Sequence, residues 1–153
     1  MPDRFIDRTL RAFSDDLSAD APVPGGGSAA AYAGAMGAAL AAMVARITLK
    51  KEDSEELKSY IEETDNLRSD FLRLVDDDSA AYARVAEAMK LPRKTEDEKK
   101  ERQERMQAAL LAASRVPLEV AETAASRGAM PWAASAALLS RDRSCSFSAR
   151  GLP

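Results

Sequence analysis

The chain has 153 residues, a formal net charge of −3, no histidine and a single cysteine, Cys145. This length suits one domain with a sizeable core. The cysteine and histidine counts exclude a disulfide framework and argue against a zinc or two-histidine iron site, and the interspersed charges leave no block suited to nucleic acid. Because hydrophobic residues make up 46% and aromatic residues only 5%, we expect closely packed helices with small and aliphatic side chains.

The first predicted element is an amphipathic helix over residues 3–18. Its apolar side chains recur at spacings of three and four along one face: Phe5, Ile6, Leu10, Phe13 and Leu17. Asp3 is a candidate cap for the first turn. The opening ten residues are charged throughout and lack the apolar stretch of a signal peptide, so we expect a cytoplasmic protein.

A loop rich in proline and glycine, PVPGGGS over residues 22–28, separates this helix from the next one. Prolines stop a helix, and glycines allow backbone angles that other residues avoid. Ser28 stands where an N-cap belongs, with a hydroxyl that accepts from backbone N–H groups of the following turn. The helix that begins there is expected to run to about Leu49.

Several functions of this loop and helix can be weighed from local pattern. A dinucleotide fingerprint would need a preceding strand, and a phosphate loop of the Walker type would need a lysine. A membrane span would need about 20 strongly apolar residues, whereas this run consists largely of alanine and glycine and ends at Arg46. Two interpretations remain. Either the loop and helix start bind an anionic or carbonyl oxygen, or the loop is a tight turn before a helix whose small residues let neighbouring helices approach: Gly34, Gly37, Ala38, Ala41 and Ala42.

Residues 54–90 contain neither glycine nor proline, and their apolar side chains recur with a helical period, which predicts one long helix. Asp78 falls near the centre of the apolar stripe, whereas Asp76 and Asp77 are expected to point away from it into solvent. A carboxylate among core residues must find hydrogen-bond donors or hold its proton. Asp78 is therefore either a structural residue bonded to a neighbouring helix end or an arginine, or a functional acid/base or ligand-binding group.

The fourth predicted helix follows a break at Leu91 and Pro92. Thr95 and Glu98 form the pattern of a capping box, which predicts a helix start. Pro117 is expected to kink this helix or divide it in two. The apolar stripe that should face the core consists of Met106, Leu110, Ala113, Val116 and Val120.

Beyond Gly128 the periodicity ends, and a short run of alanine and leucine gives way to mixed serine and arginine. We therefore expect a helical domain over residues 1–127 and a divergent tail over residues 128–153 that packs on this domain or trails from it.

Three stretches in the same order, PGGGSAAAYAGAMGAALAAMV, LVDDDSAAYARVAEAMKLPRKTEDEKKER and QAALLAASRVPLEVAE, resemble the cyclodeaminase domain of the formiminotransferase-cyclodeaminase family. The same fold serves as a free-standing methenyltetrahydrofolate cyclohydrolase in bacteria. The resemblance covers about residues 3–125 and implies an all-α, antiparallel helical bundle that forms a homodimer. Because the family's closing motifs are missing after Gly128, the C-terminal part is expected to be truncated or divergent.

The resemblance also implies roles for individual residues. The family's catalytic carboxylate, the last acid of its Leu-Val-Asp-x-Asp motif, falls on Asp78, and Asp76 is a weaker candidate for orienting the ligand. Lys90 is a candidate for meeting an anionic group, although a solvated lysine is the simpler interpretation. Neither a metal nor a resident cofactor is expected, since the tetrahydrofolate derivative is the substrate. The residues expected to hold this substrate are Pro24, Gly25, Gly26, Gly27 and Ser28.

Two reactions are implied. In cyclodeamination, N10 of 5-formiminotetrahydrofolate attacks the formimino carbon and ammonia leaves; in the cyclohydrolase reaction, water adds to the methenyl carbon and the ring opens. Both reactions move protons at neutral pH. In a chain without histidine this leaves carboxylates, lysines, tyrosines or water, and a carboxylate whose pKa is raised by burial is the natural candidate. The alternative is a catalytically inactive helical protein that dimerises or binds folate.

Overall fold

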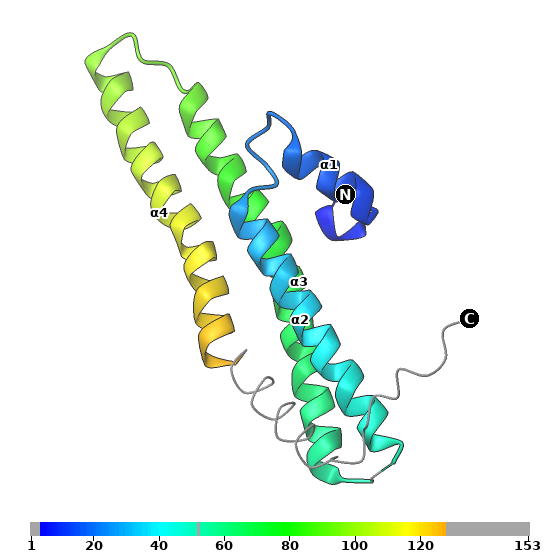
Figure 1. Ribbon diagram of the computed structural model, residues 1–153. Coiled ribbons are helices and arrows are strands. Elements are labelled where there is room, and N and C mark those ends of the chain that lie inside the picture. Colours follow the sequence, from blue (N-terminus) through cyan, green and yellow to red (C-terminus); the bar gives the residue numbers. More distant parts are fainter. Residues whose placement is uncertain (1–3, 52, 128–153) are drawn as a thin grey trace.

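The computed structural model of the protein describes residues 4–51 and 53–127. Within these ranges the chain forms one short 3₁₀-helix, Phe5–Asp7, and four α-helices, without a strand (Figure 1). The α-helices are α1 (Leu10–Ser18), α2 (Gly26–Leu49), α3 (Glu55–Lys90) and α4 (Glu96–Ser126). The predicted all-α class is confirmed. The predicted tail, residues 128–153, lies outside the described residues.

Helix α3 is the central helix of the described fold. Figure 1 shows α2 and α4 running alongside α3, each antiparallel to it, while α1 lies beside the α2–α3 pair near the start of α2. The contact of α2 with α3 is the most extensive, that of α4 with α3 comes next, and α4 touches α2 at few positions. The predicted antiparallel bundle is therefore built around one long central helix.

The ends of α3 and α4 follow from their caps, as the sequence predicted. Ser54 caps α3 by accepting a hydrogen bond from the N–H of Leu57 at 3.4 Å, and α3 ends at Lys90 before the Leu91–Pro92 break. Thr95 and Glu98 form the predicted capping box at the start of α4. Pro117 lies inside α4 and does not divide it, because the helix continues to Ser126.

The prediction of one helix over residues 3–18 is wrong. Arg8 and Thr9 have extended backbone angles that separate the 3₁₀-helix from α1. The Thr9 side chain accepts a hydrogen bond from the N–H of Ala12 at 3.1 Å, and threonine stabilises a helix start more than a helix interior. Asp3, the predicted cap, lies outside the described residues.

The core lies at the α2–α3 contact. Alanines of α2 pack against larger aliphatic and aromatic residues of α3, and one residue of α4 joins them; the buried set is Ala31, Ala35, Ala38, Leu67, Phe71, Leu74, Val75 and Val120. The stripe predicted for α4 is only partly correct. Val120 is buried, but Leu110 is 50% exposed, since the first half of α4 has only α3 as a neighbour among the described residues.

The outer face of α2 is apolar and exposed. Four large side chains on it are about half accessible: Met36, Leu40, Met43 and Ile47. By length and composition α2 is apolar enough to cross a membrane, with a mean hydropathy of 1.5 over its best window, of which 33% is buried. The sequence analysis expected alanine and glycine to make this segment too weakly hydrophobic for such a span. Its mean hydropathy shows that this expectation is wrong. The inner face packs on α3.

Gly34 and Gly37 of α2 offer a matched test of this packing. A Cβ at Gly34 would lie 2.8–2.9 Å from three atoms of the Phe71 ring, whereas a Cβ at Gly37 would meet nothing within 4 Å. Replacing glycine by alanine inside a helix gains about 1 kcal/mol of helix propensity, and overpacking a core costs about 1–3 kcal/mol. Denaturant unfolding should therefore show Gly37→Ala stabilised and Gly34→Ala destabilised. Equal stabilisation of both variants would contradict the observed contact between the helices.

Candidate functional site: the Asp78 carboxylate at the start of helix α2

Asp78 lies on α3 beside the first turn of α2. Its Oδ2 accepts hydrogen bonds from the backbone N–H of Ser28 at 2.8 Å and from the Ser28 hydroxyl at 2.9 Å. The N-cap residue of α2 is Gly25, which has no side chain to cap the helix. Asp78 therefore caps α2 from the neighbouring helix, in the place where an N-cap oxygen normally sits.

This approach is so close that it requires a glycine at one position of the loop. A Cβ on Gly27 would lie 2.2 Å from Oδ1, 2.6 Å from Cγ and 2.9 Å from Oδ2 of Asp78. A Cβ on Gly25 would lie 3.7 Å from Oδ2, an ordinary contact, and one on Gly26 would meet nothing within 4 Å. Of the three consecutive glycines, Gly27 is the one that the position of Asp78 demands.

The prediction that Ser28 is an N-cap whose hydroxyl accepts from the next turn is wrong. Helix α2 begins at Gly26, so Ser28 is its third residue. Its side chain is fully buried and its hydroxyl lies 3.0 Å from the Val75 carbonyl oxygen and 3.2 Å from the Ser79 hydroxyl, besides its bond to Asp78. The serine thus donates toward α3 instead of accepting from α2.

Sequence reasoning missed Ser79. Its side chain is buried, at 8% exposure, and its hydroxyl pairs with that of Ser28. A signal was present: Ser79 follows Val75 by four residues, so both fall on the face of α3 that meets α2. A small polar residue on that face needs a partner.

The first turn of α2 offers polar contacts to the Asp78 carboxyl group. Two donors converge on Oδ2, and the N-terminus of a helix carries a partial positive charge that favours an anion. The carboxylate is half-buried, not enclosed in the core as the stripe pattern suggested. Within residues 4–51 and 53–127, no group donates a hydrogen bond to Oδ1. Among the described residues, Oδ2 is thus held by two hydrogen bonds and Oδ1 accepts none, although Oδ1 is the carboxylate oxygen nearer to Gly27.

The sequence predicted that Asp76 points into solvent, and the structure shows that it does not. It accepts hydrogen bonds from Arg4 Nε and from the backbone N–H of Phe5, both at 2.9 Å, and its side chain is only 22% exposed. The hydrogen bond with Asp76 raises the pKa of the Arg4 guanidinium above its usual value. The Asp76 carboxylate therefore ties the N-terminal 3₁₀-helix to α3. Asp77 does lie on the outer side, paired with Arg73.

The N-terminal segment held by Asp76 contacts α2 through aromatic side chains. The rings of Phe5 and Phe13 meet edge to face with centroids 6.3 Å apart, and Phe13 lies 5.4 Å from Tyr32. Tyr32 follows Ser28 by one turn of α2. The salt bridge of Arg4 with Asp76 and this aromatic cluster thus hold the N-terminal segment against α2, the helix whose first turn contacts Asp78.

The remaining predicted residues divide into those near Asp78 and one that is remote. Pro24 is buried just before α2 and follows a cis peptide bond, and Gly26 is exposed at the helix start. Lys90 is exposed in the last turn of α3. It follows Asp78 by 12 positions, which is about 18 Å along a helix axis. The structure therefore does not bring Lys90 to the carboxylate.

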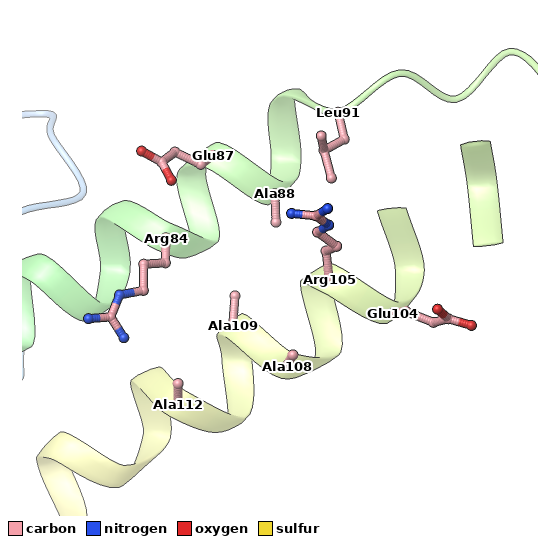
Figure 2. Close-up of a pocket in the computed structure, with 9 residues that line it drawn as sticks. All are labelled: Arg84, Glu87, Ala88, Leu91, Glu104, Arg105, Ala108, Ala109 and Ala112. Atoms are coloured by element: carbon pink, nitrogen blue, oxygen red, sulfur yellow. The ribbon is translucent and has the colours of Figure 1, made fainter. Parts of the chain in front are cut away.

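Two open grooves lie elsewhere, on α4. One of about 630 Å³ runs between α3 and α4, and Figure 2 shows Arg84 and Arg105 extending toward it above a floor of alanines. A second of about 390 Å³ is lined by Arg93, Lys99 and Arg102 with neighbouring polar residues. Neither groove contains a residue of the predicted site. Among the described residues, no cluster of three His, Cys, Asp or Glu side chains could hold a metal ion.

The sequence of this chain is similar to those of known folate enzymes. The sequence profile of a family described as formiminotransferase-cyclodeaminase matches residues 9–146, and so extends past Gly128. The chain is 42% identical over 114 residues to a methenyltetrahydrofolate cyclohydrolase from Methylorubrum extorquens, a match that covers 72% of this chain and 55% of the relative. It is 38% identical over 123 residues to the mouse formimidoyltransferase-cyclodeaminase, covering 78% of this chain and 23% of the relative.

A solved structure agrees with the fold. The crystal structure of formiminotetrahydrofolate cyclodeaminase from Thermotoga maritima superposes with a TM-score of 0.62 at 32% identity, covering 76% of this chain and 56% of that one. The chain thus spans about half the length of that structure and of the bacterial cyclohydrolase. With the family's motifs, its helical fold and its sequence profile all present, the chain belongs to the formiminotransferase-cyclodeaminase family.

Proposed function

We propose that this chain is a folate one-carbon enzyme that acts on a tetrahydrofolate derivative, as a formiminotetrahydrofolate cyclodeaminase or a methenyltetrahydrofolate cyclohydrolase. The family membership and the activities for which its relatives are named support this substrate class. The observation that carries the proposal is the Asp78 carboxylate, which Ser28 holds through Oδ2 and whose Oδ1 accepts no hydrogen bond from the described residues.

In this proposal Asp78 enters the reaction as a base. The Ser28 N–H and hydroxyl hold Oδ2, so Oδ1 is the atom proposed to take the proton. For cyclodeamination, Oδ1 takes the proton that N10 loses on attacking the formimino carbon, and the proton then leaves with the departing ammonia. For the cyclohydrolase reaction, Oδ1 takes a proton from the attacking water and returns it to the ring nitrogen that leaves when the ring opens. One carboxylate near its substrate suffices for either step, and no resident cofactor or metal takes part.

The start of α2 is the proposed place for the ligand's polar atoms. The first N–H groups of a helix have no partner within the helix, and Gly26 is exposed there. An oxygen of the folate ring system can approach these N–H groups because the glycines carry no side chains. Pro24 and Gly25 would border the ligand, Asp76 would act only through the N-terminal segment, and Lys90 would meet an anionic end of a long ligand.

The assembly proposed for this enzyme is a homodimer in the cytoplasm. The exposed apolar side chains of α2 are spaced by four, three and four residues, which is the seam of a coiled coil: Met36, Leu40, Met43 and Ile47. These side chains are between 47% and 59% exposed. A second copy that laid the same seam against them would bury both faces.

Asp78→Asn tests the catalytic role. The amide keeps the size of the carboxylate and can still accept from Ser28, but it cannot take up a proton near neutral pH. We expect a folded variant that still binds folate and loses turnover at least about 100-fold, the lower end of general acid–base contributions. The measurement is the near-ultraviolet absorbance of methenyltetrahydrofolate, which forms in one reaction and disappears in the other.

The matched control is Asp77→Asn on the same helix. Asp77 pairs with Arg73 on the exposed side, and such surface pairs contribute little, so this variant should keep wild-type turnover. Wild-type turnover in folded Asp78→Asn would overturn the role of Asp78. A wild-type chain that is folded but turns over neither substrate would instead support the alternative, an inactive protein that dimerises or binds folate.

Gly27→Ala and Gly26→Ala test the geometry of the loop. The added methyl group at Gly27 collides with the Asp78 carboxylate, and at Gly26 it meets nothing. Misplacing a reacting group by about 1 Å can reduce the rate about 100-fold. We therefore expect Gly27→Ala to lower kcat strongly, and Gly26→Ala, which adds its methyl group where the ligand is proposed to approach, to raise KM with little change in kcat. Both are measured on protein that circular dichroism shows to be folded. Equal kcat in the two variants would show that the Asp78 contact does not matter for turnover.

Leu40→Glu tests the dimer. Leu40 is 59% exposed in the middle of the seam, and a buried charge without a partner opposes association. Sedimentation at micromolar concentration should show a dimer for the wild type and a monomer for Leu40→Glu. The control is Leu111→Glu on α4, where an equally exposed leucine lies outside the seam; it should remain dimeric. A monomeric wild type would eliminate the proposed seam.

A further inference from the structure

The hydroxyl of Ser28 has more acceptors around it than it has protons. It lies 2.9 Å from Asp78 Oδ2, 3.0 Å from the Val75 carbonyl oxygen and 3.2 Å from Ser79 Oγ. A serine hydroxyl donates one hydrogen and accepts up to two. The carbonyl oxygen and the ionised carboxylate are acceptors only, so the single proton of Ser28 is directed to them. In the pair of serines, Ser79 is therefore the donor and Ser28 the acceptor.

Ser79 also departs from the behaviour of other hydroxyl residues in these helices. Thr48, Thr64, Ser69 and Ser126 each donate to the carbonyl oxygen four residues earlier in their own helix. For Ser79 that oxygen would be the Val75 carbonyl, but the bond to Val75 comes from Ser28 of α2. The Ser79 hydroxyl is directed across the helix contact to Ser28.

We propose that Ser79 is a positioning residue for the reaction: it donates to Ser28, and Ser28 in turn holds Oδ2 of Asp78 so that Oδ1 faces the substrate. This inference rests on the proposed function of Asp78. A hydroxyl that accepts one hydrogen bond becomes a better donor in the next, so Ser79 strengthens the bond from Ser28 to the carboxylate. Both serines are buried, which shields this chain of hydrogen bonds from water. Ser79 itself does not touch the substrate in this arrangement.

The first experiment compares Ser79→Ala with the wild type. A net hydrogen bond is worth about 1 kcal/mol, so kcat should fall roughly threefold to tenfold while KM changes little, because the ligand contacts remain. Ser69→Ala is the control on the same helix: its hydroxyl bonds to Asp65 of its own helix at an exposed position. It should leave kcat unchanged.

A second pair of variants separates the hydroxyl from the shape of the side chain. Ser79→Thr keeps the hydroxyl and adds a methyl group. Valine has nearly the volume of threonine, so Ser79→Val adds the same bulk but carries a methyl group in place of the hydroxyl. Ser79→Thr should retain most of the wild-type kcat, and Ser79→Val should lose as much as Ser79→Ala. Equal kcat in the threonine and valine variants would overturn the proposal, because a structural role in packing would treat them alike.

A double-mutant cycle with Ser28 provides the deciding test. If Ser79 acts through the Ser28 hydroxyl, adding Ser79→Ala to Ser28→Ala should lower kcat no further. An undiminished effect of Ser79→Ala in that background would refute the relay. The failure of the relay is distinguishable from that of the proposed function: inactive Asp78→Asn with fully active Ser79→Ala overturns only the relay, whereas fully active Asp78→Asn overturns the role of Asp78 itself.

Discussion

The described structure depends on how closely α2 lies against α3. At Gly34 the ring of Phe71 occupies the space of a Cβ, and at Gly27 the carboxylate of Asp78 does so. Along the same helix α2 presents alanines, three of which belong to the buried core: Ala31, Ala35 and Ala38. Close packing through small residues therefore does two things at once: it builds the core from few large side chains, and it brings a carboxylate of one helix against the N-terminus of another.

That contact explains why an aspartate is tolerated on the inner face of a long helix. The first turn of α2 supplies donors that no side chain of its own loop could satisfy, since its N-cap is a glycine. Asp78 satisfies one of them, the backbone N–H of Ser28, and the positive end of the helix attracts a carboxylate. The same bonds use only Oδ2, so a residue with a clear structural role keeps an oxygen for chemistry. Structural and catalytic interpretations of Asp78 are thus compatible.

Features that depend on residues close in the sequence could be predicted from the sequence alone. Features that depend on residues far apart in the sequence could not. The span of α3, the capping box at Thr95 and the unusual position of Asp78 follow from local periodicity. The role of Ser28 did not, because three side-chain-free glycines give no sign of which one begins the helix. The partner of Asp76 could not be read either, since Arg4 lies 72 positions away. Ser79 was overlooked although its position on the stripe was visible.

A crystal structure of the chain with a bound tetrahydrofolate derivative tests the central claim most directly. The account predicts that the ligand lies at the start of α2, with a reacting nitrogen or a water within hydrogen-bond distance of Asp78 Oδ1 while Ser28 still holds Oδ2. A ligand seated instead in the groove between α3 and α4, beside Arg84 and Arg105 and remote from Asp78, would contradict it.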